Sequence, residues 1–163
     1  RIRNHSYMSQ IERDEQRIRA TAEHFTPTEL VQKMLDSLPE ELFSDSTKTF
    51  IDPACGDGQF LSEVIIRKME RNGCTLEQAL STTYGVELME DNVKLCKERL
   101  AGPKPTMKVL KILDKNIVCA DALTYDYRFG ETVFWEGAEP WMSLPIRAIK
   151  LLKSYVTGSR EFF

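Results

Sequence analysis

The chain has 163 residues, 42% of them hydrophobic, so it is long enough for one core and too short for two ordinary domains. Its 22 basic and 25 acidic side chains leave a net charge of -3, which argues against binding nucleic acid by bulk electrostatics, because that needs a basic face. The four cysteines form no CxxC pair, which excludes zinc-finger spacing and favours reduced thiols in a cytoplasmic protein. No apolar run approaches the roughly 20 residues that a bilayer-spanning helix needs.

The first 20 residues read as a polar N-terminal helix or arm. Arginines alternate with acidic residues between Glu12 and Arg19, a pattern typical of a solvated helix face, although a helix lying along DNA or a partner is an alternative. We therefore divide the chain into this arm, 1–20, and one folded domain, 21–163. The chain starts with Arg1 rather than Met, so we expect the native start to be missing.

A helix is predicted to begin after Thr26. Thr26 is a suitable N-cap, Pro27 suits the first helical position, and Glu29 lies three residues after the cap. Apolar residues then follow at helical spacing from Leu30 to Leu38, and Pro39 should end the helix.

Short apolar runs alternate with amphipathic segments along the rest of the domain. Strands are predicted at 49–51, 83–88, 116–119 and 132–135. Helices are predicted from about residue 60 to a break at Asn72-Gly73, at 75–80, at 90–100 and at 146–155, with a loop at 102–105. Strands separated by helices imply a parallel sheet with right-handed crossovers.

Three polar signals follow three successive predicted strands. The turn from Asp52 to Gly58 contains Gly56 and Gly58, which let the backbone pass close to an adenosine moiety. Glu87 ends the second strand and can accept two ribose hydroxyls, and Asp121 follows the third and can accept from an adenine amine. Singly, a structural turn, a surface carboxylate and a turn aspartate explain them as well. Jointly they indicate a ligand site, because ligands bind beyond the carboxyl ends of parallel strands.

At this point the chain resembles the amino-methylating DNA methyltransferases. Asp52-Pro-Ala-Cys-Gly-Asp-Gly-Gln-Phe-Leu61 looks like the cofactor motif of that family. The segment His24-Phe25-Thr26-Pro27 is similar to the one that packs over the methionine part of the ligand in the subgroup with an N-terminal cofactor motif. Gly85 to Leu88 and Ala120 to Leu123 resemble the ribose and adenine motifs. The resemblance covers about residues 21–123, and the adenine-N6 enzymes are the nearest group.

The resemblance implies an α/β, Rossmann-like methyltransferase fold, with a mostly parallel sheet flanked by helices and a reduced number of strands. It implies S-adenosylmethionine as cofactor, S-adenosylhomocysteine as product, and no metal. Asp52 or a neighbouring backbone group would hold the amino group of the methionine moiety, with Phe25 and Thr26 closing the pocket. The residues expected around the cofactor are Phe25, Thr26, Asp52, Ala54, Cys55, Gly56, Gly58, Phe60, Glu87, Leu88, Asp121 and Ala122.

The catalytic motif of the family, Asn or Asp followed by Pro-Pro and an aromatic residue, has no clear match. The closest segment is Ala138-Glu139-Pro140-Trp141, which keeps the second proline and an aromatic ring that can stack on a flipped base. Glu139, Pro140 and Trp141 are therefore the candidate catalytic residues, with an ordinary loop around a buried Trp as the alternative. Ala138 has no polar group to align the target amine, and catalysis by positioning tolerates such a change poorly.

Two functions remain in view. The first is an S-adenosylmethionine-dependent methyltransferase of the DNA adenine-N6 type, or the cofactor-binding part of one, with DNA as its partner. The second is a catalytically inactive S-adenosylmethionine-binding regulatory or structural subunit. Too few residues follow Asp121 for the usual remaining strands, which would leave an open sheet edge. We expect the helix at 146–155, a second copy of the chain or a partner subunit to cover that edge; no membrane partner is expected.

Overall fold

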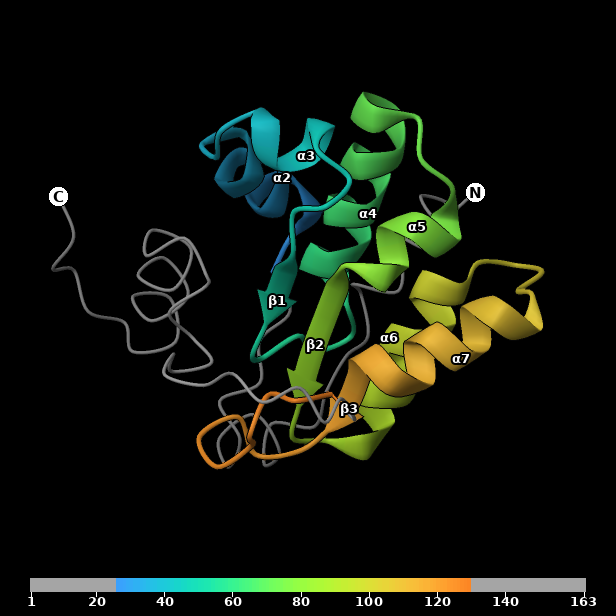
Figure 1. Cartoon of the computed structure of the whole chain (residues 1–163). Helices are drawn as coiled ribbons and strands as arrows, with labels where there is room; N and C mark the ends of the chain where they lie inside the picture. Colours follow the sequence, from blue (N-terminus) through green and yellow to red (C-terminus); the bar gives the residue numbers. More distant parts are fainter. Residues whose placement is uncertain (1–25, 130–163) are drawn as a thin grey trace, which may run out of the picture. The chain divides into compact units, whose positions relative to one another are not determined.

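The structure of the protein, a computed structural model, describes residues 26–129. The chain divides into two compact units, Arg1–Thr124 and Tyr125–Phe163. The elements of the first unit, in chain order, are α2 (Thr28–Asp36), α3 (Glu41–Ser44), β1 (Phe50–Asp52), α4 (Gln59–Asn72), α5 (Leu76–Ser81), β2 (Thr83–Glu87), α6 (Glu90–Ala101), α7 (Met107–Asn116) and β3 (Ile117–Cys119) (Figure 1). The predicted arm at 1–20, strand at 132–135 and helix at 146–155 lie outside the described residues, so the predicted domain division stays a prediction.

The strands form a parallel sheet in the order β1-β2-β3. Asp52 pairs with Gly85, which in turn pairs with Ile117, so these three residues form one row across the sheet. The arrows of β1 and β2 point the same way in Figure 1, which brings the carboxyl ends of the strands to one edge. The predicted α/β class and parallel sheet are confirmed.

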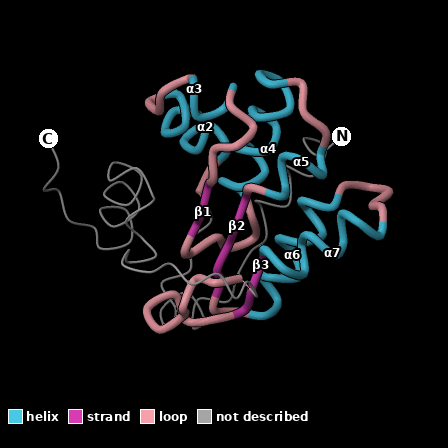
Figure 2. Tube along the Cα trace, in the orientation of Figure 1, coloured by secondary structure: helices cyan, strands magenta, loops and turns pink. Residues whose placement is uncertain are grey.

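Two crossover helices pack against this sheet. Helix α4 contacts β1 and β2, α6 contacts β2 and β3, and the two helices contact each other. Right-handed crossovers that step in one direction place their helices on the same face, which explains the contact. Figure 2 shows these helices beside the strands. The core between them is made of Cys55, Leu61, Ile65, Ala79, Leu80, Val93, Cys96, Leu100, Ala101, Val109, Leu113 and Ile117.

A smaller apolar cluster joins α2 and α3 to α4. Its buried members are Val31, Leu35, Phe43 and Val64. The Phe43 ring stacks on the Phe50 ring with centroids 5.4 Å apart, which extends the cluster to the start of β1. This cluster packs α2 and α3 against α4 and so holds α2 beside the start of α4.

The start of α2 differs from the prediction by one residue. The carbonyl of Pro27 accepts from the backbone N–H groups of Leu30 (3.0 Å) and Val31 (3.1 Å), so Pro27 is the N-cap and the prediction of Thr26 as the cap is wrong. Pro27 has φ -58° and ψ 141°, an extended backbone that a proline ring adopts readily before a helix. The helix ends at Asp36, before Pro39, as predicted.

Helix α7 was not predicted, because the sequence interpretation passed from the loop at 102–105 directly to a strand at Asn116. Thr106 caps α7 by accepting from the backbone N–H of Val109 at 3.1 Å. Val109, Leu113 and Asn116 are buried at helical spacing, so Asn116 ends the helix and β3 begins at Ile117. The signal was present as a Thr cap and a short apolar stripe.

The described part of the second unit, Tyr125 to Phe129, is a short aromatic turn. Tyr125 packs edge-to-face on both Tyr127 and Phe129, with ring centroids 5.3 Å apart in each pair. The Tyr125 hydroxyl accepts from the backbone N–H of Phe129 at 3.1 Å. Between residues 26 and 129, the helices are all too short or too polar to cross a bilayer.

Candidate functional site

The loop from β1 to α4 makes a turn whose backbone favours glycine at two positions. Gly56 has φ 51° and Gly58 has φ 83°, both in the left-handed region. A Cβ atom on Gly58 would lie 2.7 Å from Cys96 Sγ, so α6 also excludes a side chain there. The loop is tied to β2 by a hydrogen bond of 3.0 Å from Cys55 N to the carbonyl of Val86.

Glu87, at the end of β2, is held by two backbone donors. Oε2 accepts from the N–H of Gly56 at 3.0 Å, and Oε1 accepts from the N–H of Met89 at 2.9 Å. Each carboxylate oxygen keeps acceptor capacity, because an ionised carboxylate offers about four lone-pair sites. The carboxylate is therefore fixed in orientation but can accept further hydrogen bonds.

Asp52, at the end of β1, is a buried carboxylate. Its Oδ1 accepts from the N–H of Ala54 at 3.0 Å, and the residue is 6% exposed. Burial raises the pKa of Asp52 to about 6; the Ala54 N–H opposes this rise, and the neighbouring charge of Glu87 adds to it. No Lys or Arg in the described part of the chain forms an ion pair with Asp52 or Glu87. Two carboxylates without a paired cation suit a ligand that carries positive charge.

Asp121 follows β3 and lies on the surface. Its Oδ1 accepts from the N–H of Leu123 at 2.9 Å, which closes a local turn. The N–H of Ala120 donates to the carbonyl of Glu87 at 3.0 Å, so this turn starts beside the end of β2. Leu88 and Leu123 are 62% and 94% exposed, which leaves apolar surface next to both carboxylates.

Thr26 and Phe60 lie at the start of the two helices that flank the turn. Gln59 Nε2 donates to Thr28 Oγ1, so the beginning of α2 lies against the beginning of α4. Thr26 is buried, whereas Phe60 is half-buried and packs against the smaller apolar cluster. Among the other predicted cofactor residues, Ala54 is exposed and Ala122 is half-buried.

Cys55 and Cys96 are buried thiols beneath the turn. The pKa of Cys55 is raised well above its ordinary value, first by the hydrogen bond with Cys96 and then by burial. A Cβ atom on Gly85 would lie 2.8 Å from Cys55 Sγ, so the Cys55 side chain packs down onto β2. Cys55 is therefore a packing group rather than a nucleophile, because the reactive form is the thiolate.

The sequence interpretation missed a buried ion pair in the loop. Arg99 Nε donates to the backbone carbonyl of Asp57 at 2.8 Å, and Arg99 Nη2 donates to Asp57 Oδ2. Both side chains are 2% exposed. The signal was a charged residue on the buried stripe of α6, where Arg99 follows Val93 and Cys96 at helical spacing.

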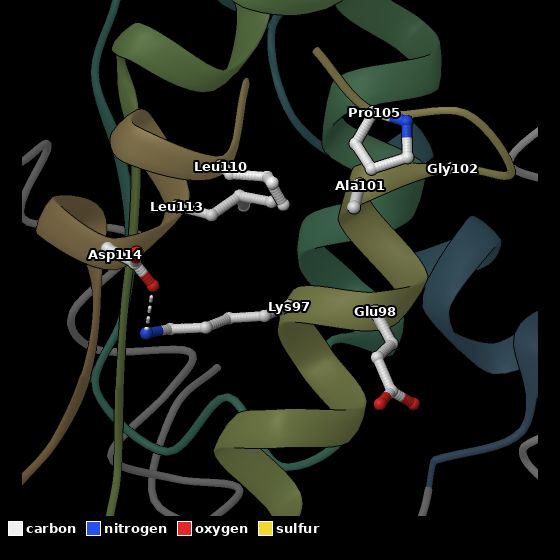
Figure 3. Close-up of a pocket in the computed structure, with 8 residues that line it drawn as sticks. All are labelled: Lys97, Glu98, Ala101, Gly102, Pro105, Leu110, Leu113 and Asp114. Atoms are coloured by element: carbon white, nitrogen blue, oxygen red, sulfur yellow. Dashed lines mark hydrogen bonds and ion pairs between the residues drawn. The ribbon is translucent and has the colours of Figure 1, made fainter. Parts of the chain in front are cut away.

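A hollow of about 360 Å³ lies between α6 and α7 (Figure 3). The Lys97 Nζ group points to Asp114 Oδ1 at 2.9 Å, and the rest of the lining is mostly apolar. None of the predicted cofactor residues lines it. Of the remaining predictions, Phe25, Glu139, Pro140 and Trp141 lie outside the described residues.

A parallel sheet with a glycine turn after its first strand, and a carboxylate at or just beyond the end of each strand, is consistent with a Rossmann-like fold of the methyltransferase type. Residues 11–129 match the model of a family described as N-6 DNA methylase, and the chain belongs to this family. The predicted resemblance to adenine-N6 methyltransferases is thereby confirmed. The match ends before the candidate catalytic segment at 138–141. No curated protein and no solved structure matches the chain.

Proposed function

We propose that the chain binds S-adenosylmethionine at the carboxyl ends of β1, β2 and β3. We further propose that it acts as a DNA adenine-N6 methyltransferase or as the cofactor-binding part of one. The observation that carries the proposal is the pair of carboxylates, Asp52 and Glu87, around a glycine turn, with no described basic side chain paired to either. Family membership supports the same class of reaction.

The residues present fit this cofactor. A buried carboxylate at Asp52, destabilised in its charged form, gains most from a cationic neighbour such as the ammonium group of the methionine moiety. Glu87, already aligned by Gly56 and Met89, accepts from ribose hydroxyls without having to reorganise. When bound, the cofactor supplies an electrophilic methyl group on its sulfonium.

The adenine end would lie between β2 and the turn after β3. Leu88 offers exposed apolar surface for the ring, and Asp121 offers a carboxylate for the exocyclic amine. Thr26 and Phe25 would close the pocket from the side of α2, and Ala54, Cys55, Phe60 and Ala122 would complete its wall. Small residues in the turn allow the backbone to approach the ligand closely.

Calorimetric titration of the full chain with S-adenosylhomocysteine tests the binding step. We expect Asp52→Ala and Gly56→Val to abolish binding, because one removes the charge and the other places a branched side chain at φ 51°. Asp114→Asn is the matched control, since it removes an exposed carboxylate from the hollow between α6 and α7. Unchanged affinity in both site variants would overturn the cofactor assignment.

Turnover separates the enzyme from the inactive subunit. The full chain is incubated with S-adenosylmethionine, with and without unmethylated double-stranded DNA, and the products are identified by mass spectrometry. S-adenosylhomocysteine together with N6-methyladenine supports the methyltransferase, and Trp141→Ala should then reduce the rate if this ring stacks on the target base. Binding without turnover supports the inactive subunit, which Ala138 favours because it carries no group to align an amine.

Restoring that group is the complementary test. If only the Ala138 side chain is lacking, Ala138→Asn should create or raise activity, with Glu139 and Pro140 unchanged beside it. An inactive Ala138→Asn variant that still binds the cofactor would place the defect in the wider architecture.

A further inference from the structure

Arg99 is a buried cation in the last turn of α6. Two of its nitrogen atoms bind the loop between β1 and α4, which includes Gly56, Asp57 and Gly58. Its Nε donates to the main-chain carbonyl of Asp57 at 2.8 Å, while its Nη2 donates to the carboxylate of the same residue. Backbone and side chain of Asp57 are thus fixed together. The guanidinium fork is suited to this, because its donors are rigid and planar.

Stability of the fold alone does not account for this pair. Buried ion pairs contribute little net stability compared with apolar residues of the same volume, because both charges must be desolvated. Apart from Asn92, the other buried residues of α6 are Val93, Cys96, Leu100 and Ala101, which belong to the hydrophobic core. We therefore look for a role of Arg99 in fixing the geometry of the loop rather than in stabilising the fold.

The geometry of Asp57 controls the groups that face the ligand. Asp57 lies between Gly56 and Gly58, both at positive φ, and glycine alone leaves such a backbone free to adopt other conformations. The N–H of Gly56 orients the Glu87 carboxylate, so a rotation of the Asp57 peptide would reach Glu87. Cys96, three residues before Arg99, closes the other side against Gly58. One face of α6 thus determines the shape of the loop.

We propose that Arg99 is a positioning residue, which keeps the loop from Gly56 to Gly58 in the conformation that binds S-adenosylmethionine. This inference rests on the proposed function. Arg99 does not touch the ligand; it acts through Asp57. Its loss destabilises the fold, because Asp57 is left buried without its partner, and in addition weakens cofactor affinity.

The test compares Arg99→Met with Asn116→Leu in the full chain. Asn116 is an equally buried side chain that also donates to main-chain carbonyls, those of Leu80 and Thr83, at the amino ends of β2 and β3. Thermal melting and titration with S-adenosylhomocysteine are measured for both. We expect Arg99→Met to weaken binding by about tenfold or more, since catalytic and binding geometry is sensitive to small displacements. Asn116→Leu should lower Tm but keep the affinity within about twofold, because its contacts lie away from the loop.

Two conservative variants keep the test decisive if Arg99→Met does not fold. Arg99→Lys keeps the charge but loses the fork, and Asp57→Asn keeps an acceptor but loses the charge, so each should weaken binding less than Arg99→Met. In combination they should cost less than the sum of their separate effects, because both act on one contact. Wild-type affinity in both variants, or an equal loss in Asn116→Leu, would overturn the proposal.

Amide hydrogen exchange distinguishes this inference from the cofactor assignment. We expect the Gly56 and Gly58 amides to exchange faster in Arg99→Lys than in the wild type, whether or not a ligand is present. Faster exchange in Arg99→Lys, combined with a wild-type protein that binds no S-adenosylhomocysteine, would reject the cofactor assignment but support the role of Arg99 in holding the loop. Unchanged exchange of these amides in Arg99→Lys would reject the proposed role of Arg99, even if the cofactor binds.

Discussion

The polar groups at the two ends of the sheet differ in whether the protein itself supplies their partners. At the amino ends of the strands, Lys68 Nζ donates to the carbonyl of Lys48 at 2.8 Å and to Thr82 Oγ1, and Asn116 Nδ2 donates to the carbonyls of Leu80 and Thr83. At the carboxyl ends, Asp52 and Glu87 receive backbone hydrogen bonds, but no described cation forms an ion pair with either.

On the proposed function, the difference separates groups that stabilise the fold from groups that bind the cofactor. At the amino ends, donors and acceptors are matched within the protein, which is the usual condition for buried polar groups. At the carboxyl ends, Asp57 is paired with Arg99, but Asp52 and Glu87 are oriented without a described cation beside them, and burial destabilises the charge of Asp52. Changes at the first end should alter stability alone, and changes at the second should alter affinity, sometimes with a gain in stability.

The largest effect is expected at the glycine turn. In Gly58→Ala the new Cβ meets Cys96 Sγ at 2.7 Å on a backbone at φ 83°, so strain and overpacking together should cost about 3 kcal/mol. Gly73→Ala is the matched control, because φ is 73° but nothing lies within 4 Å of its Cβ; it should cost only about 1 kcal/mol. Chemical denaturation measures both, and titration should show affinity lost in Gly58→Ala alone. Equal losses of stability in the two variants would mean that the Cys96 side chain moves aside without cost.

Asp52→Asn should change stability and affinity in opposite directions. The amide keeps an acceptor for Ala54 N–H but removes a buried charge, so the unliganded protein should gain on the order of 2 kcal/mol at pH 7. Affinity for S-adenosylmethionine should fall, because the ammonium group loses its counter-charge. A less stable variant with wild-type affinity would contradict both parts of the comparison.

The pH dependence of the wild type follows from the same shift. The pKa of Asp52 is raised from 3.8 to about 6, so its protonated form is favoured in the folded state. Its contribution to stability is therefore present below about pH 4 and is lost as pH rises through about 6. Denaturation between pH 4 and pH 7 should show that slope in the wild type and not in Asp52→Asn.

Much of this arrangement could be predicted from local sequence, and the rest could not, for a physical reason. The glycine turn, the end of α4 at Gly73 and the buried positions of α6 depend on backbone conformation and periodicity, which the residues themselves dictate. The contact of Arg99 with Asp57 joins residues 42 positions apart and depends on how α6 packs across the loop. Helix α7 could have been predicted from its threonine cap and apolar spacing, but Gly102 and Pro105 before it favoured a loop interpretation.

A smaller effect, on stability alone, is expected at the amino end. The hydroxyl of Thr83, which is 1% exposed, donates to the carbonyl of Ala79 at 2.8 Å. Thr83→Val keeps the shape but removes this hydrogen bond, which should cost about 1 kcal/mol. Titration should return wild-type affinity for S-adenosylhomocysteine. An affinity loss here would show that the two ends are coupled through β2.

The smallest effect is expected on the far side of α6, and it sharpens the comparison. Lys97 lies directly after Cys96 in the chain, yet its side chain points to Asp114 on α7 rather than to the loop between β1 and α4 (Figure 3). The pair is 29% and 74% exposed, so Lys97→Gln should change the free energy of unfolding by less than about 0.5 kcal/mol, and this change should vanish at high salt. Affinity should not change, because Cys96 and Arg99 still face the loop. A clear loss of affinity would mean that all of α6, and not only the side that faces the loop between β1 and α4, determines the geometry of that loop.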